Sequence, residues 1–501
     1  TFNRDSSATR VGQNGLIQTV GFFGNEKITN GDFATDSDWV KGANTTISGG
    51  FMNFSNATSG SYQSGVTASN IFYIVTYSIS NYSTGTIGVV LNGTPASNGT
   101  IRSSNGVFTE TIQAPSNAAS ASVLFNATGF TGSIDNVSVK EVLGDQPRLN
   151  YDISNGVVQS CPSLLLEPAS TNLVTYSEAF DNSYWTKTAA SVASGFTSPD
   201  GTNNAFKLVE DATTTTHMVQ RAFTFLNQKY TLSVFLKADE RNFIKVNLYD
   251  GSSSVYAYFD LTNGVVGQEL GANGKIENYG NGWYKCSMSS TSNVSSGNGN
   301  IGFRLAESDG GTGYVGNGTS GVYIFGAMLE ALSYPTSYIP TNGSSQTRAA
   351  ETCFGAGNAA TFNDSEGVLY VEISALSDDS AESAIAIGNG TYDERVIVYT
   401  FNNYIYAFVF AGGVNIFSLG TNEYNVKESN KIALKYKSGD YSIYINGIEK
   451  NSGTSTFTPS GIDRLNFNDS VSGLPFYGNT REVQYFDLAL TDAQLQTLTT
   501  L

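Results

Sequence analysis

The amino-acid sequence predicts an all-β protein, made of three tandem antiparallel β-sandwich domains and closed by one short helix. Aromatic residues are abundant, with 28 tyrosines and 30 phenylalanines, and 53 glycines can supply turns, whereas only 14% of the residues are charged. Short β-branched and aromatic runs alternate with Gly, Ser, Thr and Asn, which is typical of strands joined by turns. A chain of 501 residues, 40% of them hydrophobic, is long enough for roughly three domains with real cores.

The first part of the chain divides into a short arm and a first module. We expect the arm at residues 1–21 and the module at residues 22–145. Within the module, segments 71–79 (IFYIVTYSI), 87–91 (IGVVL) and 121–125 are strand candidates because of their β-branched and aromatic content.

The middle of the chain repeats this plan after a connecting segment. Residues 146–169 contain the apolar run LLL at 164–166 and are interpreted as a clasp between modules. Residues 170–340 form the second module, in which Trp185 stands where Trp39 stood in the first. Because the pattern is repeated, we expect both tryptophans in sandwich cores rather than in sugar-binding surfaces.

A polar, turn-rich linker is expected at residues 341–352, followed by a third module at 353–501. In this module the segments 431–436 and 441–445 are predicted to pair as a hairpin. Asn446-Gly447 then forms the strongest short hairpin signal of the sequence.

One helix is expected, close to the C-terminus. Thr491 and Gln494 have the spacing of a capping box, in which each side chain bonds to the backbone of the other residue. Leu495 and Leu498 follow as its apolar residues.

The charge balance argues against several classes of partner. The net charge is −17 at pH 7, whereas binding to phosphate backbones needs clusters of Lys and Arg. We therefore expect no nucleic acid and no anionic membrane as partner. The sequence has no run of 18 apolar residues, so no membrane insertion is expected.

The cysteines are Cys161, Cys286 and Cys353. They are far apart, odd in number, and match no metal or redox spacing. We expect buried or free thiols, and the alternative is one disulfide.

A set of short motifs lies within residues 1–20 and 146–350. They are SATRV at 7–11 with GLI at 15–17, PRLNY at 147–151, CPSLLLEP at 161–168 with STNL at 170–173, SPDGT at 198–202, SYPTSYIPT at 333–341 and TRAA at 347–350. The set resembles segments recurrent in tail-fibre and other virion-surface proteins of tailed bacteriophages. The resemblance implies an extracellular location on the virion surface, other virion proteins as partners, a homo-oligomer that is commonly a trimer, and further chain upstream.

Two further patterns resemble jelly-roll modules. The segments NGDF at 30–33 and IDNVSV at 134–139 resemble the opening and closing parts of galactose-binding-like carbohydrate-binding modules, and residues 170–340 follow the same plan. The order KIALKYKSGDYSIYINGIE at 431–449 resembles laminin-G or concanavalin-like jelly rolls. In the phage family the arm runs almost directly into the PRLNY segment, so the first module has the position of an insertion.

The galactose-binding-like resemblance also implies a structural Ca²⁺ in the first module. Glu26 and Asp135 would supply carboxylate oxygens, and backbone carbonyls would complete the shell. The alternative is that Asp135 is an ordinary turn or edge residue.

Sugar binding needs flat aromatic faces for the apolar side of a pyranose, with polar groups for its hydroxyls. Rings that could serve occur in each module, and the alternative for each is packing inside the sandwich. The candidate carbohydrate-binding residues are Tyr62, Tyr73, Tyr77, Trp283, Tyr284, Tyr404 and Tyr406.

We expect no catalysis. His217 is the only histidine, and no nucleophile motif surrounds it. Glu366 and Glu372 lack the framing of a glycosidase pair. The function expected is attachment to bacterial surface glycans by a virion appendage on tail or head. The alternatives are a purely structural capsid or tail decoration protein and a polysaccharide-degrading enzyme.

Overall fold

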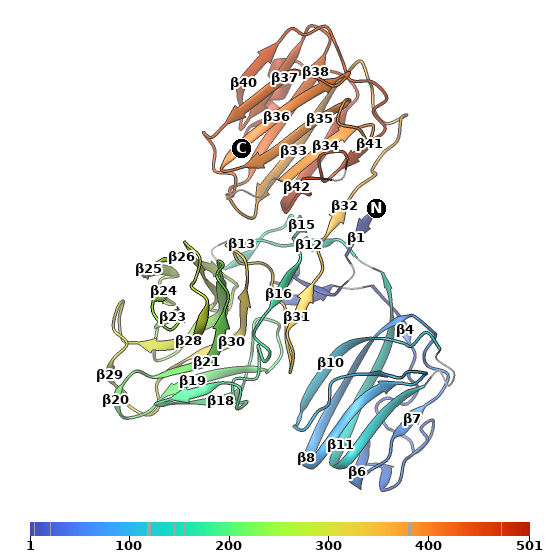
Figure 1. The fold of residues 1–501 in the computed structure, drawn as a ribbon, viewed down its shortest axis with the longest axis vertical. Helices are drawn as coiled ribbons and strands as arrows, with labels where there is room; N and C mark the ends of the chain where they lie inside the picture. Colours follow the sequence, from blue (N-terminus) through green and yellow to red (C-terminus); the bar gives the residue numbers. More distant parts are fainter. Residues whose placement is uncertain are drawn as a thin grey trace. The chain divides into compact units, whose positions relative to one another are not determined.

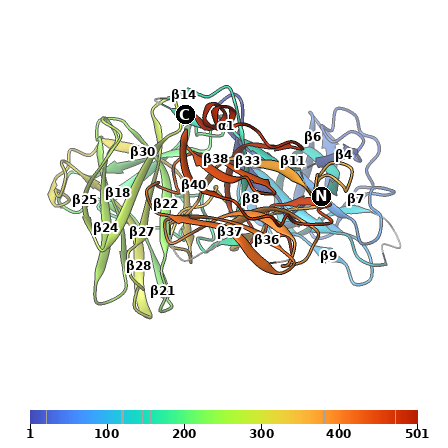
Figure 2. The ribbon, with the colours of Figure 1, turned by 90° about the horizontal axis from the view of Figure 1, so that it is seen from above.

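The structure, a computed structural model, describes residues 1–4, 6–20, 22–117, 122–144, 146–154, 156–378, 383–471 and 473–501. Throughout these residues the sheets are antiparallel (Figure 1), and the one helix is α1 (Asp492–Thr499) (Figure 2). The all-β prediction with a short C-terminal helix is therefore confirmed. By their internal contacts the residues form two compact units, Gly21–Gly144, and Thr1–Val20 with Asp145–Leu501. The described part of the chain contains no helix with the length and apolar character of a membrane span.

The unit Gly21–Gly144 is built on one eight-stranded sheet with two very long strands. β8 (Phe72–Leu91) and β11 (Val123–Gly144) pair along much of their length, and their register shifts at several bulges. Bulges bend and twist a strand, so a single sheet can fold over its own core. The remaining strands are β4 (Phe22–Glu26), β5 (Thr45–Ser48), β6 (Phe51–Ala57), β7 (Ser61–Gln63), β9 (Ser97–Asn98) and β10 (Gly106–Gln113).

This arrangement differs from the sequence expectation in one respect. The segments expected as separate strands at 71–79 and 87–91 both fall in β8, except for Ile71, and β8 stays extended through the polar residues between them. The candidate at 121–125 continues into β11, and its first residue, Ala121, lies outside the described residues. Trp39 is buried, with its ring 6.0 Å from that of Phe125, so its expected core position is confirmed.

The middle of the chain forms a sandwich of two six-stranded sheets. Trp185 lies in its core, stacked on Phe180 at 5.1 Å, which confirms the expected core position. One sheet has the order β17 (Thr186–Thr188), β21 (Met218–Phe225), β28 (Gly297–Ala306), β23 (Phe243–Tyr249), β24 (Ser254–Asp260) and β25 (Val265–Leu270). The other has the order β18 (Ala190–Phe196), β19 (Ala205–Glu210), β30 (Gly321–Glu330), β22 (Thr231–Ala238), β27 (Trp283–Ser290) and β26 (Ala272–Asn278). A small sheet pairs β20 (Thr214–Thr215) with β29 (Tyr314–Val315).

The C-terminal part forms a sandwich of a seven-stranded and a five-stranded sheet. The seven-stranded sheet has the order β12 (Arg148–Asn150), β15 (Ser163–Leu166), β42 (Gly478–Phe486), β33 (Glu366–Ala375), β38 (Asn430–Lys437), β39 (Tyr441–Ile445) and β40 (Ile448–Gly453). The five-stranded sheet has the order β37 (Val414–Thr421), β36 (Tyr404–Ala411), β35 (Arg395–Phe401), β34 (Ser383–Gly388) and β41 (Arg464–Asn466).

Both local predictions in this part are confirmed. β38 pairs with β39, and β39 turns into β40 through Asn446 and Gly447, which have φ angles of 51° and 81°. Positive φ at both turn residues is what a type I′ hairpin requires. The helix α1 begins at the Thr491–Gln494 capping box and packs on β38 and β39 (Figure 2). The thiols of Cys161, Cys286 and Cys353 are free, as expected.

The segments expected as arm, clasp and linker are hydrogen-bonded to one another. β15 from the clasp pairs with β42, so the clasp extends the seven-stranded sheet, and Leu166 lies in the core of that sandwich. The expected linker contributes a strand that pairs beside the start of the middle sandwich. The small sheets here are β1 (Phe2–Asn3) with β32 (Thr352–Cys353), β2 (Ala8–Val11) with β3 (Ile17–Val20), β13 (Ile153–Ser154) with β14 (Val157–Val158), and β16 (Ser170–Asn172) with β31 (Gln346–Arg348).

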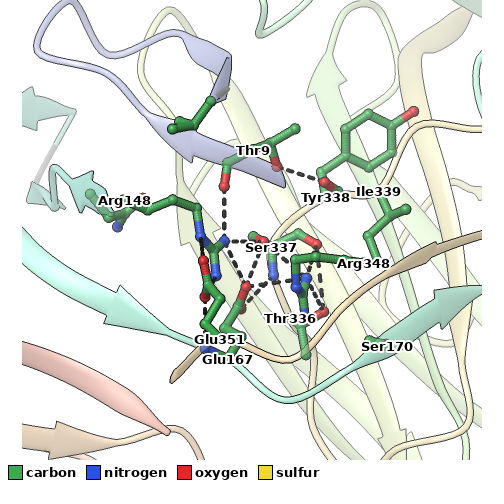
Figure 3. Close-up of polar contacts among 12 residues, drawn as sticks. Thr9, Arg148, Glu167, Ser170, Thr336, Ser337, Tyr338, Ile339, Arg348 and Glu351 are labelled. Atoms are coloured by element: carbon green, nitrogen blue, oxygen red, sulfur yellow. Dashed lines mark hydrogen bonds and ion pairs between the residues drawn. The ribbon is translucent and has the colours of Figure 1, made fainter. Parts of the chain in front are cut away.

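A buried ionic network joins these segments (Figure 3). The Arg148 guanidinium forms a bidentate pair with Glu351 and a second pair with Glu167 at 2.7 Å. Arg348 lies 3.2 Å from Glu167, and Arg4 lies 2.6 Å from Glu351. All five side chains are at most 3% exposed. Burying charges is costly unless they are paired and hydrogen-bonded, as they are here.

The SYPTSYIPT segment completes the network with polar groups. The Ser337 amide and hydroxyl both donate to Glu167, at 2.7 and 2.6 Å. Thr9 donates its hydroxyl to the Tyr338 carbonyl at 2.6 Å, and the Thr9 carbonyl accepts from Arg148 at 2.9 Å (Figure 3). Five of the motifs therefore contribute to one buried network, where their side chains bond to one another rather than face solvent. They are SATRV, PRLNY, CPSLLLEP, SYPTSYIPT and TRAA.

Candidate functional site

A row of aromatic side chains lies on the outward face of the five-stranded sheet. Along β36 the residues alternate, with Ile405, Ala407 and Val409 in the sandwich core. Successive side chains of a strand point to opposite faces, so the residues between them point outward. The aromatic row consists of Tyr399 on β35 and of Tyr404, Tyr406, Phe408 and Phe410 on β36.

The rings of this aromatic row are nearly parallel. Tyr404 and Tyr406 have centroids 5.5 Å apart with an interplanar angle of 18°, and Tyr406 lies 4.9 Å from Tyr399 at 16°. Phe408 continues the row 5.7 Å from Tyr399, and Phe410 lies 5.9 Å beyond it. These are offset-stacked contacts of the kind that stabilise aromatic pairs. All five rings remain partly exposed, so the row is an apolar strip at the surface.

The register of the sheet explains why these rings can pack so closely. Tyr399 and Tyr406 are direct partners in the pairing of β35 with β36. On the other side Tyr406 faces Gly420 of β37, where a Cβ atom would come within 2.8 Å of the ring. The absence of a side chain at Gly420 therefore leaves the space that the Tyr406 ring occupies.

A guanidinium lies at one end of the aromatic row. The Arg395 guanidinium carbon is 4.7 Å from the centroid of the Phe410 ring and 4.9 Å from that of Tyr392, which is 53% exposed. Arg395 donates to the Asp469 carbonyl at 2.9 Å, and its Nε has no hydrogen-bond partner among the described residues. Burial lowers the pKa of Arg395, but a guanidinium stays charged. The site thus combines an apolar strip with a cationic donor.

The structure brings together Tyr404 and Tyr406 and separates the other predicted sugar-binding residues. Tyr73 and Tyr77 lie in the core of the unit Gly21–Gly144, and burial raises the pKa of Tyr77 to about 12. Trp283 is buried in a cluster with Phe235.

Tyr62 and Tyr284 remain partly exposed and have no place in such a row. Tyr62 lies on β7, opposite Leu124. Tyr284 packs against the core of the middle sandwich and next to Gly264. Neither is part of a run of stacked rings.

Phe408, Phe410, Arg395 and Tyr392 were not among the predicted site residues. A signal was present for two of them, because YIYAFVFA at 404–411 places an aromatic residue at every second position. Strict alternation predicts that such rings share one face of a strand. The position of Arg395 depends on the pairing of β35 with β36, which the sequence pattern does not fix.

The two residues expected to hold calcium are separately hydrogen-bonded. Glu26 accepts from the Val139 amide at 2.7 Å and from the Ser138 hydroxyl at 2.6 Å, whereas Asp135 accepts from the Asn136 amide at 2.6 Å. Among the residues that the structure describes, no three His, Cys, Asp or Glu side chains converge. Because backbone carbonyls were expected to complete the shell, calcium binding by Glu26 and Asp135 stays a prediction.

His217 is buried in the middle sandwich, with Nδ1 2.7 Å from the Ala189 carbonyl and its ring 4.8 Å from that of Tyr314. Glu366 pairs with Lys437 at 2.9 Å, and Glu372 accepts from the Ser429 hydroxyl at 2.9 Å. These contacts give each group a structural partner.

No family model and no curated protein matches the chain. Among solved structures, the carbohydrate-binding domain CBM40 of the Ruminococcus gnavus IT-sialidase, bound to α2,3-sialyllactose, is 20% identical, with a TM-score of 0.26, and covers 30% of this chain and 94% of its own. The leech intramolecular trans-sialidase is 18% identical, with a TM-score of 0.26, and the match covers 30% of this chain and 26% of the sialidase. Domains LG4-5 of the mouse laminin α1 chain are 11% identical, with a TM-score of 0.21, and the match covers 61% of this chain and 96% of the laminin domains. Such values assign no function.

Proposed function

We propose that the chain binds a saccharide through the aromatic row on β35 and β36. The observation that carries this proposal is the continuous strip of partly exposed rings from Tyr404 to Phe410, which are nearly parallel except for Phe410, tilted by 30° to Phe408. Exposed aromatic strips are costly in water unless they serve an interaction. The apolar C–H face of a pyranose can pack on the strip, and Arg395 can donate to sugar hydroxyls.

The hydroxyl groups of the row are suited to the same ligand. In the described part of the chain, the Tyr404 and Tyr406 hydroxyls have no hydrogen-bond partner, so they can donate to and accept from sugar hydroxyls without breaking a protein contact. A shallow, solvent-facing strip gives a weak single site. We expect a dissociation constant near the millimolar range, on the order of −4 kcal/mol.

The biological setting proposed is a virion-surface appendage of a tailed phage, attached to tail or head, that binds host-surface polysaccharide. The motifs that resemble phage fibre proteins support this setting, and so does their convergence in the buried network around Arg148 and Glu351. Buried ion pairs among the connecting segments suit an appendage that must withstand attachment to a host. A trimer would present three such faces, and multivalency would raise weak binding without new contacts.

An array of bacterial surface polysaccharides, probed with the full chain, tests the proposal. Binding to at least one polysaccharide should be lost in Tyr406→Ala and kept in Tyr62→Ala, which removes a partly exposed tyrosine from the other unit. No binding on the array by a chain that still enters intact virions would support a decoration role instead. Release of reducing ends from the polysaccharide would support an enzyme.

A further inference from the structure

A second outward face carries two positive charges that have no carboxylate partner among the residues that the structure describes. In the middle sandwich, Ile244, Val246 and Leu248 of β23 point into the core, so Lys245 and Asn247 point to the opposite face. This face belongs to the six-stranded sheet that contains β28 and β24. It is distinct from the aromatic row and lies in the other sandwich of the same unit.

Lys245 and Arg304 are direct partners in the pairing of β23 with β28. Like charges placed directly opposite one another destabilise a sheet. Within the described residues neither side chain forms an ion pair with a carboxylate, although acidic residues exceed basic ones by 17 charges in the whole chain. Burial, with the Arg304 charge adding to it, lowers the pKa of Lys245 to about 8. A bound anion would reduce the repulsion between these two positive charges.

Aromatic rings lie beside the two cations. The Lys245 ammonium is 3.6 Å from the centroid of the Tyr256 ring and 5.3 Å from that of Tyr258. Both tyrosines are on β24, the strand that pairs with β23 on the side away from β28. Cation–π contact partly offsets the missing counter-charge. If the flexible Lys245 side chain moves off Tyr256, the face of that ring becomes available to a ligand.

The face also contains buried polar atoms without partners. Asn247 is 1% exposed, and neither its Nδ2 nor its Oδ1 has a hydrogen-bond partner among the described residues. The same holds for Arg304 Nε and for Asn300 Oδ1 on the neighbouring strand β28. Most buried polar groups in proteins are satisfied, so several orphaned ones beside two unpaired cations indicate a missing partner. That partner must offer both donors and acceptors, because Asn247 lacks both.

We propose that this face binds a saccharide that carries a carboxylate, such as a hexuronic acid. Arg304 and Lys245 would hold the carboxylate, since a guanidinium binds it through paired hydrogen bonds. The Asn247 and Asn300 amides would bond to the ring hydroxyls, and Tyr256 would pack on the apolar face of the sugar. This site stands independently of the aromatic row.

Saturation-transfer NMR with the full chain tests this site, with sodium glucuronate as the probe and glucuronamide as its uncharged counterpart. Glucuronate should bind, and glucuronamide should bind at least about tenfold more weakly, because charge-assisted hydrogen bonds are lost. Arg304→Gln and Lys245→Gln should each weaken glucuronate binding by about tenfold or more. Lys229→Gln, which removes one charge from the loop before β22, should leave the binding unchanged.

A stability measurement separates a ligand site from a structural role. Because Lys245 and Arg304 repel each other, Lys245→Gln should melt at the same temperature as the unmodified chain or at a higher one. Binding that is lost without loss of stability supports the proposal. The proposal is overturned if glucuronate does not bind, or if Arg304→Gln and Lys245→Gln both bind glucuronate normally. It is also overturned if inorganic phosphate displaces bound glucuronate as well as added glucuronate does. Tyr406→Ala, which removes one ring of the aromatic row, should not change the binding of glucuronate.

Discussion

Arg148 and Glu351, 203 residues apart in the chain, form a bidentate ion pair with no exposed side-chain surface. Arg148 lies on β12, at the edge of the seven-stranded sheet, while Glu351 follows the strand β31 that pairs beside the middle sandwich. The Glu351 carboxylate also accepts from the Glu167 amide at 2.9 Å. The buried Glu351 carboxylate therefore bonds both to Arg148 and to the Glu167 backbone, in segments that connect the two sandwiches.

Removing the guanidinium should destabilise the chain strongly. Arg148→Met removes the guanidinium that bonds to both Glu351 and Glu167, and it leaves each carboxylate with one buried cation, Arg4 and Arg348 respectively. The cost should approach the about 3–5 kcal/mol of a broken buried pair. Denaturant unfolding followed by tyrosine fluorescence measures this change. The control is Arg464→Met, which breaks a half-exposed pair with Asp463 and should cost at most about 1 kcal/mol. Equal effects of the two substitutions would show that the network contributes little.

Low pH should weaken the same ionic network because it protonates the Glu167 carboxylate. Burial alone would raise the pKa of this carboxyl, but Arg348, Arg148 and the Ser337 hydrogen bonds lower it to about 2. The unfolded value is about 4.3, so this stabilisation is present above that pH and is lost as the pH falls toward 2. The melting temperature should therefore fall over this window. In Glu167→Gln the fall should be smaller, and an unchanged pH profile would contradict the assignment.

Glu178 should show the opposite pH dependence. Burial raises the pKa of its carboxyl to about 7, and the nearby Asp200 charge adds to the effect, while Tyr338 donates to Glu178 at 2.9 Å. A raised pKa contributes stability below about pH 4.3 and loses it as the pH rises through 7. Glu178→Gln should therefore melt higher than the unmodified chain at pH 8, and this advantage should shrink at pH 5. A lower melting temperature at pH 8 would be inconsistent with this account.

The C-terminal helix should depend on its N-cap residue, Thr491. The Thr491 hydroxyl accepts from the Gln494 amide, and the Gln494 side chain accepts from the Thr491 amide at 2.9 Å. Thr491→Ala should cost about 1 kcal/mol, the usual worth of an N-cap. Amide hydrogen exchange should become faster in α1 and stay unchanged in β8, which belongs to the other unit. Unchanged exchange in α1 would mean that packing of Leu495 on the sheet holds the helix without its cap.

Local patterns predicted the local structure well. The Asn446-Gly447 turn and the Thr491 cap were predictable because a few adjacent residues determine them. The continuity of β8 was not, because the polar residues of its middle pair with β11, far away in the chain. Local signals cannot reveal pairing between distant segments.

The candidate sites show the same limit. Tyr404 and Tyr406 were predicted from sequence, whereas Tyr73 and Tyr77 have the same composition around them and are buried. Alternation gives the two faces of a strand but does not show which face another sheet covers. The neighbouring positions of Lys245 and Arg304 likewise follow only from the pairing of β23 with β28.

The most direct test of the proposed saccharide binding is the affinity of the full chain for an oligosaccharide from a polysaccharide that binds on the array. Isothermal titration calorimetry should give a dissociation constant near the millimolar range for one site. Tyr406→Ala, which removes the ring between Tyr404 and Tyr399, should weaken it about tenfold, as expected for the loss of a stacking ring worth about 1.4 kcal/mol. An affinity that Tyr406→Ala leaves unchanged in a folded chain would contradict the assignment of the aromatic row.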